Sequence, residues 1–302
     1  MTDNLEKRCG FVGLIGAPNA GKSTLMNCLV GSKVSIVSPK VQTTRSRVLG
    51  ITIHDQSQII FVDTPGIFTP QKRMEKAMVA AAWQGARDAD VIAVLIDASR
   101  SKISDESWGI IKRLETEERK AILILNKIDL IKRDTLLALA DELNKSGVFT
   151  DIYMVSALKG DGIKKLMDDL SKTMPEGPWH YAEDQISDMP MRLLAAEITR
   201  EKIFLQLQQE LPYETTVETE EWEVFDNGDI KIRQIIYVMR KSQKAIVLGK
   251  KGVRIKSIGE KSRKELEELF DTRVHLNLFV KVRENWIDDP ERYRDWGLDF
   301  NA

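Results

Sequence analysis

The sequence has few of the side chains that build disulfide frameworks and metal clusters. It contains two cysteines, Cys9 and Cys28, and three histidines among 302 residues. Two isolated cysteines form no disulfide framework and no CxxC metal motif, and the scattered histidines match no ligand spacing. Cys28 falls in a segment with a helical pattern, where simple packing explains it. These scarcities leave no cysteine- or histidine-based metal site to predict.

Long hydrophobic runs are also absent. No N-terminal apolar stretch resembles a signal peptide, and the longest aliphatic runs, such as residues 91–96, are far too short to cross a bilayer. We therefore expect a cytoplasmic protein. The formal net charge is −1, so the overall charge indicates no partner. A hydrophobic content of 42% in 302 residues is enough for two domains with their own cores.

The first part of the chain alternates short apolar runs with helical patterns. Runs of this length are typical of buried strands in a largely parallel sheet. We therefore predict one α/β domain over residues 1–174, with a hairpin over residues 48–62. Open sheets of this kind bind ligands just past the carboxyl ends of their strands. The residues that directly follow the apolar runs are Gly16, Asp63, Asp97, Asn126 and Ser156.

The pattern changes after residue 174. Residues 175–190 carry three prolines and no apolar periodicity, which predicts a linker. Residues 191–302 begin with a helical pattern, followed by two strand patterns joined at Asp226-Asn227-Gly228, a hairpin turn signal. A short helix, a glycine loop, a longer helix and a third strand complete the order α-β-β-α-α-β. We predict an α+β domain with a C-terminal tail.

The segment from Gly16 to Ser23, GAPNAGKS, matches the phosphate-loop pattern GxxxxGK(S/T). It lies between an expected strand and an expected helix, as the pattern requires. Glycines let the backbone wrap closely around an anion, so that successive N–H groups point at the phosphates. Lys22 adds a cation for the β- and γ-phosphates, and Ser23 adds a hydroxyl for Mg²⁺. The predicted nucleotide contacts here are Gly16, Asn19, Ala20, Gly21, Lys22, Ser23 and Thr24.

Two further segments are predicted to sense the terminal phosphate. Asp63 begins the motif DTPG at the end of an apolar run, where its carboxylate can hold a Mg²⁺-bound water. The Gly66 N–H can contact the γ-phosphate and move when that phosphate leaves. Residues 42–45, QTTR, supply a threonine that reaches Mg²⁺ only beside the γ-phosphate, and we favour Thr44 over Thr43. The predicted contacts are Asp63, Thr64 and Gly66 for the nucleotide, Lys22, Thr44 and Gly66 for catalysis, and Ser23, Thr44 and Asp63 for the metal.

The third nucleotide motif is NKID, which is typical of a guanine site. The Asp129 carboxylate can accept from guanine N1–H and the 2-amino group together, whereas adenine has no matching donors. We expect Lys127 to lie along the base plane and Asn126 to join this loop to the phosphate loop. Ser156-Ala157-Leu158 follows the next apolar run. We expect the Ala157 N–H to meet guanine O6, although an ordinary strand end explains this tripeptide equally well.

Charge is unevenly distributed in the second domain. Residues 229–264 contain 12 Lys and Arg against 2 Asp and Glu, whereas residues 207–228 contain 7 acidic and no basic residues. A basic face of this kind is typical of phosphate binding. Within it, a GxxG loop between two helices is typical of KH domains, which hold about four nucleotides of single-stranded RNA. The predicted RNA contacts are Gly249, Lys250, Lys251, Gly252 and Arg254. Three neighbouring apolar residues are interpreted as core rather than as a platform for bases: Ile246, Leu248 and Ile255.

The motifs GAPNAGKS, QTTR, DTPG, NKID and SALKG resemble the GTP-binding domain of the translation-factor-related GTPases. With the second domain and its GKKG loop, the chain is similar to the bacterial Era GTPase family over residues 8–290. This resemblance implies a P-loop GTPase domain followed by a type II KH domain. It also implies binding to the 3′ end of 16S ribosomal RNA, a role in maturation of the 30S subunit, and peripheral association with the inner membrane. We expect a monomer.

Ile67 stands directly after DTPG, where many signalling GTPases carry a water-orienting glutamine. Era-like GTPases share this hydrophobic substitution, so slow intrinsic turnover is expected. In related GTPases an asparagine at the place of Asn19 helps to bind K⁺, which is a further cofactor candidate, and a loop-shaping role is the alternative. Two other hypotheses stay open. One is a binding scaffold with incidental hydrolysis, and the other is a membrane-regulatory GTPase with a basic, lipid-facing domain.

Overall fold

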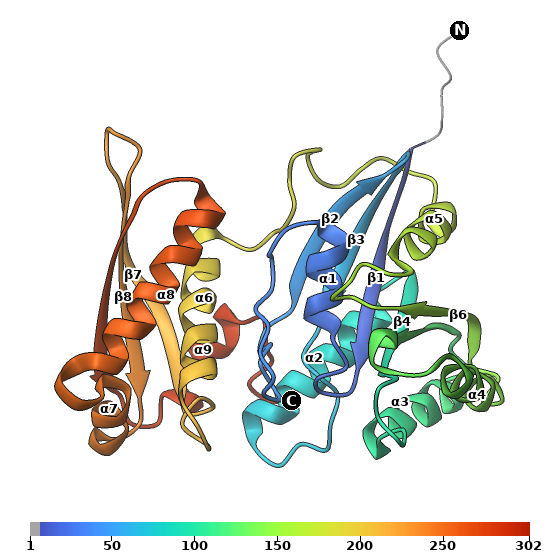
Figure 1. Cartoon of the computed structure of the whole chain (residues 1–302), viewed down its shortest axis with the longest axis horizontal. Helices are drawn as coiled ribbons and strands as arrows, with labels where there is room; N and C mark the ends of the chain where they lie inside the picture. The colour runs from blue at the N-terminus through green and yellow to red at the C-terminus, as the bar shows by residue number, and fades with distance from the viewer. Residues whose placement is uncertain (1–6) are drawn as a thin grey trace, which may run out of the picture. The chain divides into compact units, whose positions relative to one another are not determined.

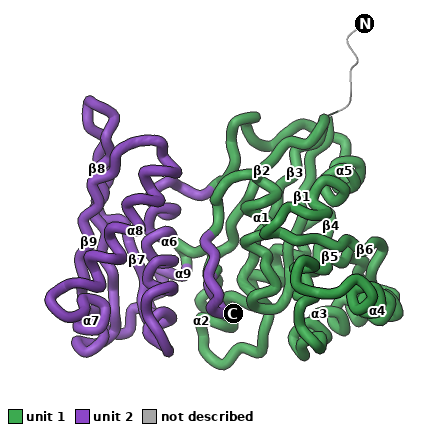
Figure 2. Tube along the Cα trace, in the orientation of Figure 1, with its two compact units in different colours: residues 1–35, 44–188, 294–302 green, residues 36–43, 189–293 purple. Residues whose placement is uncertain are grey.

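The computed structural model describes residues 7–302, so the first six residues of the predicted α/β domain lie outside the described range (Figure 1). The described chain forms two compact units, coloured separately in Figure 2. Unit 1 contains the described residues up to Ser35, Thr44–Asp188 and Arg294–Ala302, and unit 2 contains Ile36–Thr43 and Met189–Tyr293. Residues 36–43 and the predicted tail from residue 294 therefore fall in the opposite unit from the one that the sequence boundaries suggest. Among residues 7–302, no helix is long and apolar enough to cross a membrane.

Unit 1 is built on a six-stranded sheet with the order β2-β3-β1-β4-β5-β6 (Figure 1). Neighbouring strands are parallel except in the β2–β3 hairpin. β5 is buried along its whole length, as expected for a central strand of a parallel sheet covered by helices. The predicted α/β fold class is confirmed. The strands are β1 (Arg8–Gly16), β2 (Val48–His54), β3 (Ser57–Asp63), β4 (Val91–Asp97), β5 (Ala121–Asn126) and β6 (Phe149–Val155).

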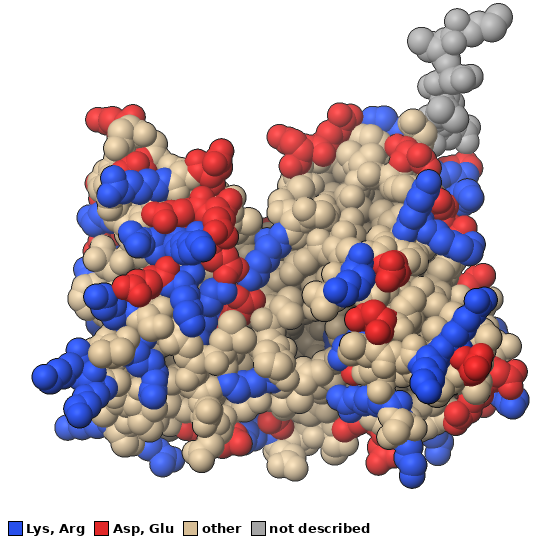
Figure 3. Space-filling model, in the orientation of Figure 1, with Lys and Arg blue, Asp and Glu red and all other residues tan. Residues whose placement is uncertain are grey.

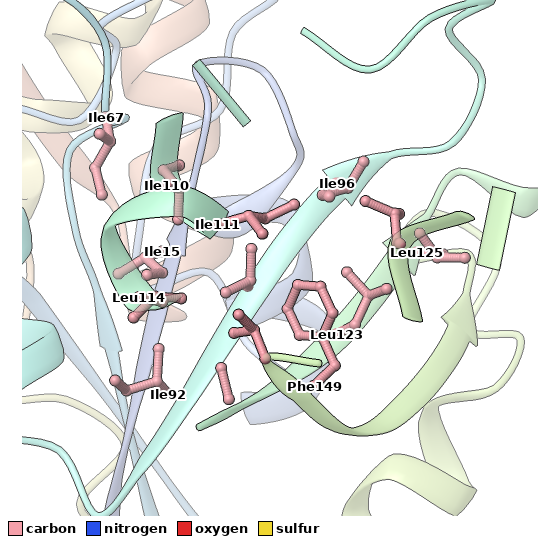
Figure 4. Close-up of a cluster of buried hydrophobic side chains, with 14 of the residues drawn as sticks. Ile15, Ile67, Ile92, Ile96, Ile110, Ile111, Leu114, Leu123, Leu125 and Phe149 are labelled. Carbon is pink, nitrogen blue, oxygen red and sulfur yellow. The ribbon is translucent and has the colours of Figure 1, made fainter. Parts of the chain in front are cut away.

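The helices of unit 1 follow from amphipathic sequence patterns and from local signals at their ends. The helix α3, for example, begins after Ser104, whose hydroxyl accepts a hydrogen bond from the Ser107 N–H at 3.2 Å. Leu114 of α3 belongs to the same buried cluster as Ile15 and Leu123 of the sheet (Figure 4). This packing fixes the strand ends that carry the site residues. The helices are α1 (Lys22–Val30), α2 (Arg73–Arg87), α3 (Asp105–Thr116), η1 (Ile128–Leu130), α4 (Arg133–Asn144) and α5 (Ile163–Thr173).

Unit 2 has the predicted order α-β-β-α-α-β around a three-stranded sheet. The strand order is β7-β8-β9, so β9 lies at one edge of the sheet. The β7–β8 pair is antiparallel and the β8–β9 pair is parallel. Ile198, Ile232 and Leu266 bring α6, β8 and α8 together in one of its buried clusters. The predicted α+β class is confirmed. The elements are α6 (Met191–Gln206), β7 (Thr215–Val224), β8 (Ile230–Val238), α7 (Lys241–Leu248), η2 (Lys250–Gly252), α8 (Val253–Phe270), β9 (Val274–Val282), η3 (Trp286–Asp288) and α9 (Pro290–Asp295).

The segment predicted as a linker, residues 175–190, is bound to unit 1 over most of its length. The side-chain oxygen of Gln58, which is fully buried, accepts hydrogen bonds from the N–H groups of His180 and Tyr181 at 2.9 and 3.0 Å. Trp179 and Tyr181 pack against a small cluster of buried side chains on β1, β2 and β3. Three prolines prevent regular structure in this segment, but they do not prevent its aromatic side chains from packing.

Candidate functional sites

The phosphate loop lies between β1 and α1, and its shape depends on a glycine. Gly21 has φ +98°, a left-handed conformation that side-chain-bearing residues rarely adopt. A Cβ there would lie 2.2 Å from Asn126 Nδ2, which donates to the Ala20 carbonyl at 2.9 Å. The structure thus contains the predicted connection between the NKID loop and the phosphate loop.

Lys22 is buried inside this loop. Its Nζ donates to the carbonyls of Gly16 and Ala17 at 3.0 and 3.1 Å. Burial lowers the pKa of Lys22 to about 8, although the negative charge of Asp63 acts in the opposite direction. A buried ammonium group of this kind is favoured by an anion, so the loop is suited to hold phosphate groups.

The three predicted metal-site residues lie together. Ser23 Oγ donates to Asp63 Oδ2 at 2.7 Å and lies 3.0 Å from Thr44 Oγ1. Ser35 Oγ donates to the same Asp63 oxygen at 2.9 Å. Burial raises the pKa of Asp63, against the effect of hydrogen bonds from Ser23 and Ser35 and of the Lys22 charge. The other carboxylate oxygen, Asp63 Oδ1, is buried and has no hydrogen-bond partner.

This oxygen-rich cluster fits Mg²⁺, a hard cation that prefers oxygen ligands and commonly combines one carboxylate with substrate phosphates. A cation near Asp63 would satisfy its unpaired oxygen and offset the desolvation of its charge. Within residues 7–302, no group of three or more His, Cys, Asp or Glu side chains could hold a metal ion. The residues that would hold a divalent cation here are therefore one carboxylate, Asp63, and the hydroxyls of Ser23 and Thr44.

The structure distinguishes the two neighbouring threonines. Thr44 reaches Ser23, whereas Thr43 Oγ1 lies 2.6 Å from Ser38 Oγ and donates to the Lys40 carbonyl at 2.8 Å. The two residues have the same chemistry, so the conformation of the segment decides between them. This placement supports Thr44 as the predicted metal ligand.

The DTPG segment is held against the phosphate loop. Thr64 Oγ1 donates to the Leu14 carbonyl at 2.9 Å, and the Ile67 N–H donates to the Gly16 carbonyl at 3.0 Å. A Cβ on Gly66 would lie 3.0 Å from Pro18, so the two segments approach closely. The Ile67 side chain is 7% exposed and belongs to the core cluster of Figure 4. It cannot polarise a water molecule, as expected from the sequence.

A pocket of about 170 Å³ lies beside the phosphate loop at the ends of β5 and β6. Asp129 Oδ1 accepts a hydrogen bond from Ser156 Oγ at 2.7 Å, which orients the carboxylate. Lys127 Nζ donates to the Asn19 carbonyl at 2.9 Å and to Asp97 Oδ2 at 2.6 Å. The pocket therefore combines an oriented acceptor with the NKID motif. Its lining residues are Gly21, Thr24, Asn126, Lys127, Asp129, Leu130, Ser156, Ala157 and Leu158.

One residue of this pocket has a hydrogen bond that the sequence does not suggest. The Ala157 N–H, predicted to meet guanine O6, donates to Asn126 Oδ1 at 3.0 Å. The Asn126 side chain thus binds the phosphate loop through its nitrogen and the strand end of β6 through its oxygen. Sequence spacing brings these segments to one edge of the sheet but does not assign their hydrogen bonds.

Two residues without a predicted role lie in the site. Asp97, at the end of β4, pairs with Lys127, and Ser35 hydrogen-bonds to Asp63. Burial raises the pKa of Asp97, but hydrogen bonds from Lys127 and Ser99 outweigh it, so the net pKa is lowered. The position of Asp97 directly after an apolar run was an available signal. Ser35 lies in a segment without any motif, so the sequence offered no signal for it.

The GKKG loop forms a second candidate site in unit 2. Gly249 has φ +72°, and a Cβ there would lie 2.8 Å from the Arg254 Cβ. Lys250 and Lys251 are exposed, and Figure 3 shows Lys and Arg side chains gathered at the α7 end of this unit. Arg254 Nη1 donates to the Ile246 carbonyl at 2.6 Å and so joins α7 to α8. The two lysines are therefore better placed for phosphate contacts than Arg254, whose guanidinium is engaged within the loop.

A groove of about 510 Å³ lies between α8 and the edge strand β9. Gly259 leaves room on the helix side, where its Cβ position lies 3.5 Å from Leu278 Cδ1. The interpretation of Ile246 as core is wrong, because its side chain is 48% exposed, whereas Leu248 and Ile255 pack partly buried against a core cluster. The groove is lined by Ile255, Lys256, Gly259, Glu260, Arg263, Val274, His275, Leu276, Asn277 and Leu278.

These two sites define the class of protein as a P-loop GTPase joined to a KH domain. Family models agree: one described as "50S ribosome-binding GTPase" matches residues 11–127, and one described as "KH domain" matches residues 210–287. The chain belongs to the GTPase Era family. GTPase Era of Afipia carboxidovorans is 56% identical over 306 residues, with 99% of each chain covered. GTPase Era of Agrobacterium fabrum is 58% identical over 296 residues, covering 98% of this chain and 93% of the relative.

Solved structures of the family have the same architecture. An Aquifex aeolicus Era variant bound to GDP·AlF4⁻ has a TM-score of 0.89 and 41% identity. Era in complex with MgGDPNP and nucleotides 1506–1542 of 16S ribosomal RNA has a TM-score of 0.90 and 41% identity. Each alignment covers 96% of this chain and 99% of the other.

Proposed function

We propose that this GTPase binds the 3′ end of 16S ribosomal RNA as a single strand and assists assembly of the 30S subunit, with GTP binding and hydrolysis as the switch. The observation that carries the proposal is the presence in one chain of an Asp129-containing base pocket and an exposed GKKG loop next to the groove between α8 and β9. The relative solved with nucleotides 1506–1542 of 16S ribosomal RNA supports this choice of RNA.

In the nucleotide site, the backbone of residues 16–24 holds the phosphates and the Lys22 ammonium neutralises their charge. Ser23, Thr44 and Asp63 are the residues that would hold Mg²⁺, which when bound supplies positive charge to the phosphate oxygens. The Gly66 N–H, two residues after Thr64, detects the γ-phosphate. No polar side chain at position 67 orients water, so backbone groups and Thr44 take that role and intrinsic turnover is slow.

Base selection depends on Asp129, whose carboxylate accepts from two guanine donors. Because the Ala157 N–H is engaged by Asn126, we assign the donor for guanine O6 to the next backbone amide, Leu158, which lines the same pocket. A pocket that leaves a carboxylate unpaired with the wrong base discriminates strongly against it.

K⁺ binding at Asn19 is part of the proposal. Asn19 has φ +63°, and its carbonyl accepts from Lys127, so the residue sits at the junction of the phosphate loop and the base pocket. A cation beside the phosphates would supply charge that a side chain does not provide here.

In the RNA site, Lys250 and Lys251 contact phosphates, and the apolar floor of the groove, formed by Ile255, Leu276 and Leu278, lies under the bases. Because β9 is an edge strand, one side of the groove is open to an extended chain. Phosphate contacts position the strand without reading its sequence. Base contacts in the groove therefore carry the specificity.

The direct test compares RNA binding by the wild type and by the double variant Lys250→Asp and Lys251→Asp, using a fluorescently labelled 16S 3′-end oligonucleotide over a range of KCl. The affinity should fall, and the slope of log K against log salt should become shallower by about 0.7 for each lost phosphate contact. GTP hydrolysis without RNA should be unchanged.

The matched control is the double variant Lys112→Asp and Lys145→Asp. Both lysines are exposed residues of unit 1, and this variant changes the net charge by the same amount as the loop variant. Equal weakening by both double variants would show non-specific charge attraction and refute the assignment of the loop.

Binding to purified 30S subunits, and to anionic vesicles with RNA as competitor, tests the proposed partners. Sedimentation tests the proposed monomer.

A further inference from the structure

Residues 36–43 join two anchor points of the nucleotide site. Before this segment, Ser35 donates its hydroxyl to Asp63 at 2.9 Å, and after it Thr44 lies 3.0 Å from Ser23. The segment contains only eight residues, so a change in its backbone conformation can shift Thr44 relative to Ser35.

Helix α6 of unit 2 binds this segment near both ends. Glu201 Oε1 accepts a hydrogen bond from the Val37 N–H at 2.8 Å. Arg200 Nη2 donates to the Thr43 carbonyl at 2.6 Å. The second contact lies on the peptide group that connects Thr43 to Thr44. It therefore acts on the backbone next to the predicted metal ligand.

The middle of the segment is bound by the end of the same helix. Lys40 Nζ donates to the carbonyls of Phe204 and Leu207. Carbonyls at the C-terminal end of a helix lack partners within the helix and attract cations. The C-terminal part of α6 and the residue that caps it, Leu207, therefore hold residues 36–43 near both ends and in the middle.

The buried position of Arg200 is unfavourable for the stability of the fold. Its side chain is 1% exposed and pairs with Glu197, and its Nη1 is buried without a hydrogen-bond partner. A buried ion pair seldom stabilises a fold more than apolar packing does, and an unsatisfied buried donor lowers stability. Besides its contact with the Phe204 ring, 5.1 Å from the ring centroid, its bond to Thr43 connects this arginine to residues 36–43.

We propose that Arg200 and Glu201, both in the KH-containing half of the chain, are positioning residues for GTP hydrolysis. They hold residues 36–43 in the conformation that brings Thr44 to Ser23. This inference rests on the proposed GTPase mechanism and adds to it a dependence of the hydrolytic step on the first helix of unit 2. It predicts that α6 affects the rate of hydrolysis without contacting the nucleotide.

The experiment uses the full-length protein with Arg200→Gln. The kcat for GTP should fall about ten- to a hundredfold, the range for loss of one charged hydrogen bond. The affinity for GDP should stay within about twofold, because GDP lacks the γ-phosphate beside which Thr44 acts. The Mg²⁺ concentration for half-maximal hydrolysis should rise. Arg200→Lys, which keeps a charged donor, should recover part of the rate.

The matched control is Arg192→Gln on the same helix. Arg192 is exposed and donates to the carbonyls of Thr219 and Glu220 in β7 rather than to residues 36–43. This control should hydrolyse GTP like the wild type. All rates are expressed per GDP-binding site, so that misfolded protein is not counted. Glu201→Ala provides a second variant if Arg200→Gln does not fold.

Wild-type kcat in both Arg200→Gln and Glu201→Ala would overturn the inference. So would an equal loss of kcat and GDP affinity, since that result indicates a purely structural role. If the wild type itself does not hydrolyse GTP, the proposed function fails rather than this inference.

Discussion

Asp129→Asn should change the base that the pocket prefers. In the structure the Asp129 carboxylate is oriented by Ser156 at 2.7 Å and lines the pocket at the ends of β5 and β6. An asparagine keeps the size of the side chain but replaces one acceptor oxygen with an NH₂ donor. That donor faces the guanine N1–H or 2-amino group, where two donors repel. Xanthine carries an oxygen in place of the 2-amino group and so matches the amide.

The size of the effect follows from the number of hydrogen bonds. Two bonds to a charged acceptor contribute about 1.5–3 kcal/mol each, so losing both should weaken guanine nucleotide binding by about 10² to 10⁴. Asp129 is exposed before a base binds, and solvent screening places the expected value in the lower part of this range.

Isothermal titration calorimetry of GDP and xanthosine diphosphate (XDP) with the wild type and the variant measures the change in affinity for each nucleotide. The expected outcome is a loss of GDP affinity of at least about a hundredfold, with a gain for XDP. Asp141→Asn, an exposed aspartate of α4 that pairs with Lys145, is the control and should leave both affinities unchanged. Unaltered GDP affinity in Asp129→Asn would refute the assignment of this carboxylate to the base.

Three further predictions concern the same unit. Asp97→Asn should lower GDP affinity several-fold, because Lys127 loses its ion pair. Since its pKa is lowered in the fold, ionised Asp97 stabilises the protein at neutral pH, and the difference in unfolding free energy between wild type and variant should shrink as the pH falls below about 3.8. A constant difference down to acidic pH in chemical denaturation would contradict this. Gly21→Ala should introduce about 1–3 kcal/mol of backbone strain and displace Asn126, so GDP should no longer raise the melting temperature. A normal GDP-induced shift would show that the loop tolerates a side chain. Hydrolysis should be faster in KCl than in NaCl, and Asn19→Ala should remove the difference; equal rates for the wild type would exclude K⁺.

Local motifs were sufficient to predict the phosphate loop, the DTPG turn and the NKID loop. Each depends on a short segment whose backbone carries its own constraint, such as the left-handed Gly21 or the strand ending at Asp63. Apolar runs were sufficient to predict the sheet, because buried parallel strands leave a continuous hydrophobic pattern. The order of elements in unit 2 was equally readable, since its turn at residues 226–228 and its GKKG loop are local signals.

Hydrogen bonds between distant segments were not predictable in the same way. The Ala157 N–H has two chemically reasonable acceptors, and only the packed loops show that Asn126 takes it. Ile246 has a core-like side chain, yet its place beside the GKKG loop leaves it 48% exposed. In both cases the deciding quantity is a distance between segments, which spacing along the chain does not contain.

The amino-acid sequence alone determined the two fold classes, the guanine nucleotide motifs and the GKKG loop, because each depends on residue types at fixed local spacing. Tertiary structure alone decided that Thr44 rather than Thr43 faces Ser23, and that residues 36–43 bind Arg200 and Glu201. Identical side chains one position apart differ only in the direction that the folded backbone gives them. The backbone on either side of these threonines also contacts a helix about 160 residues further along the chain, which no local sequence pattern reveals.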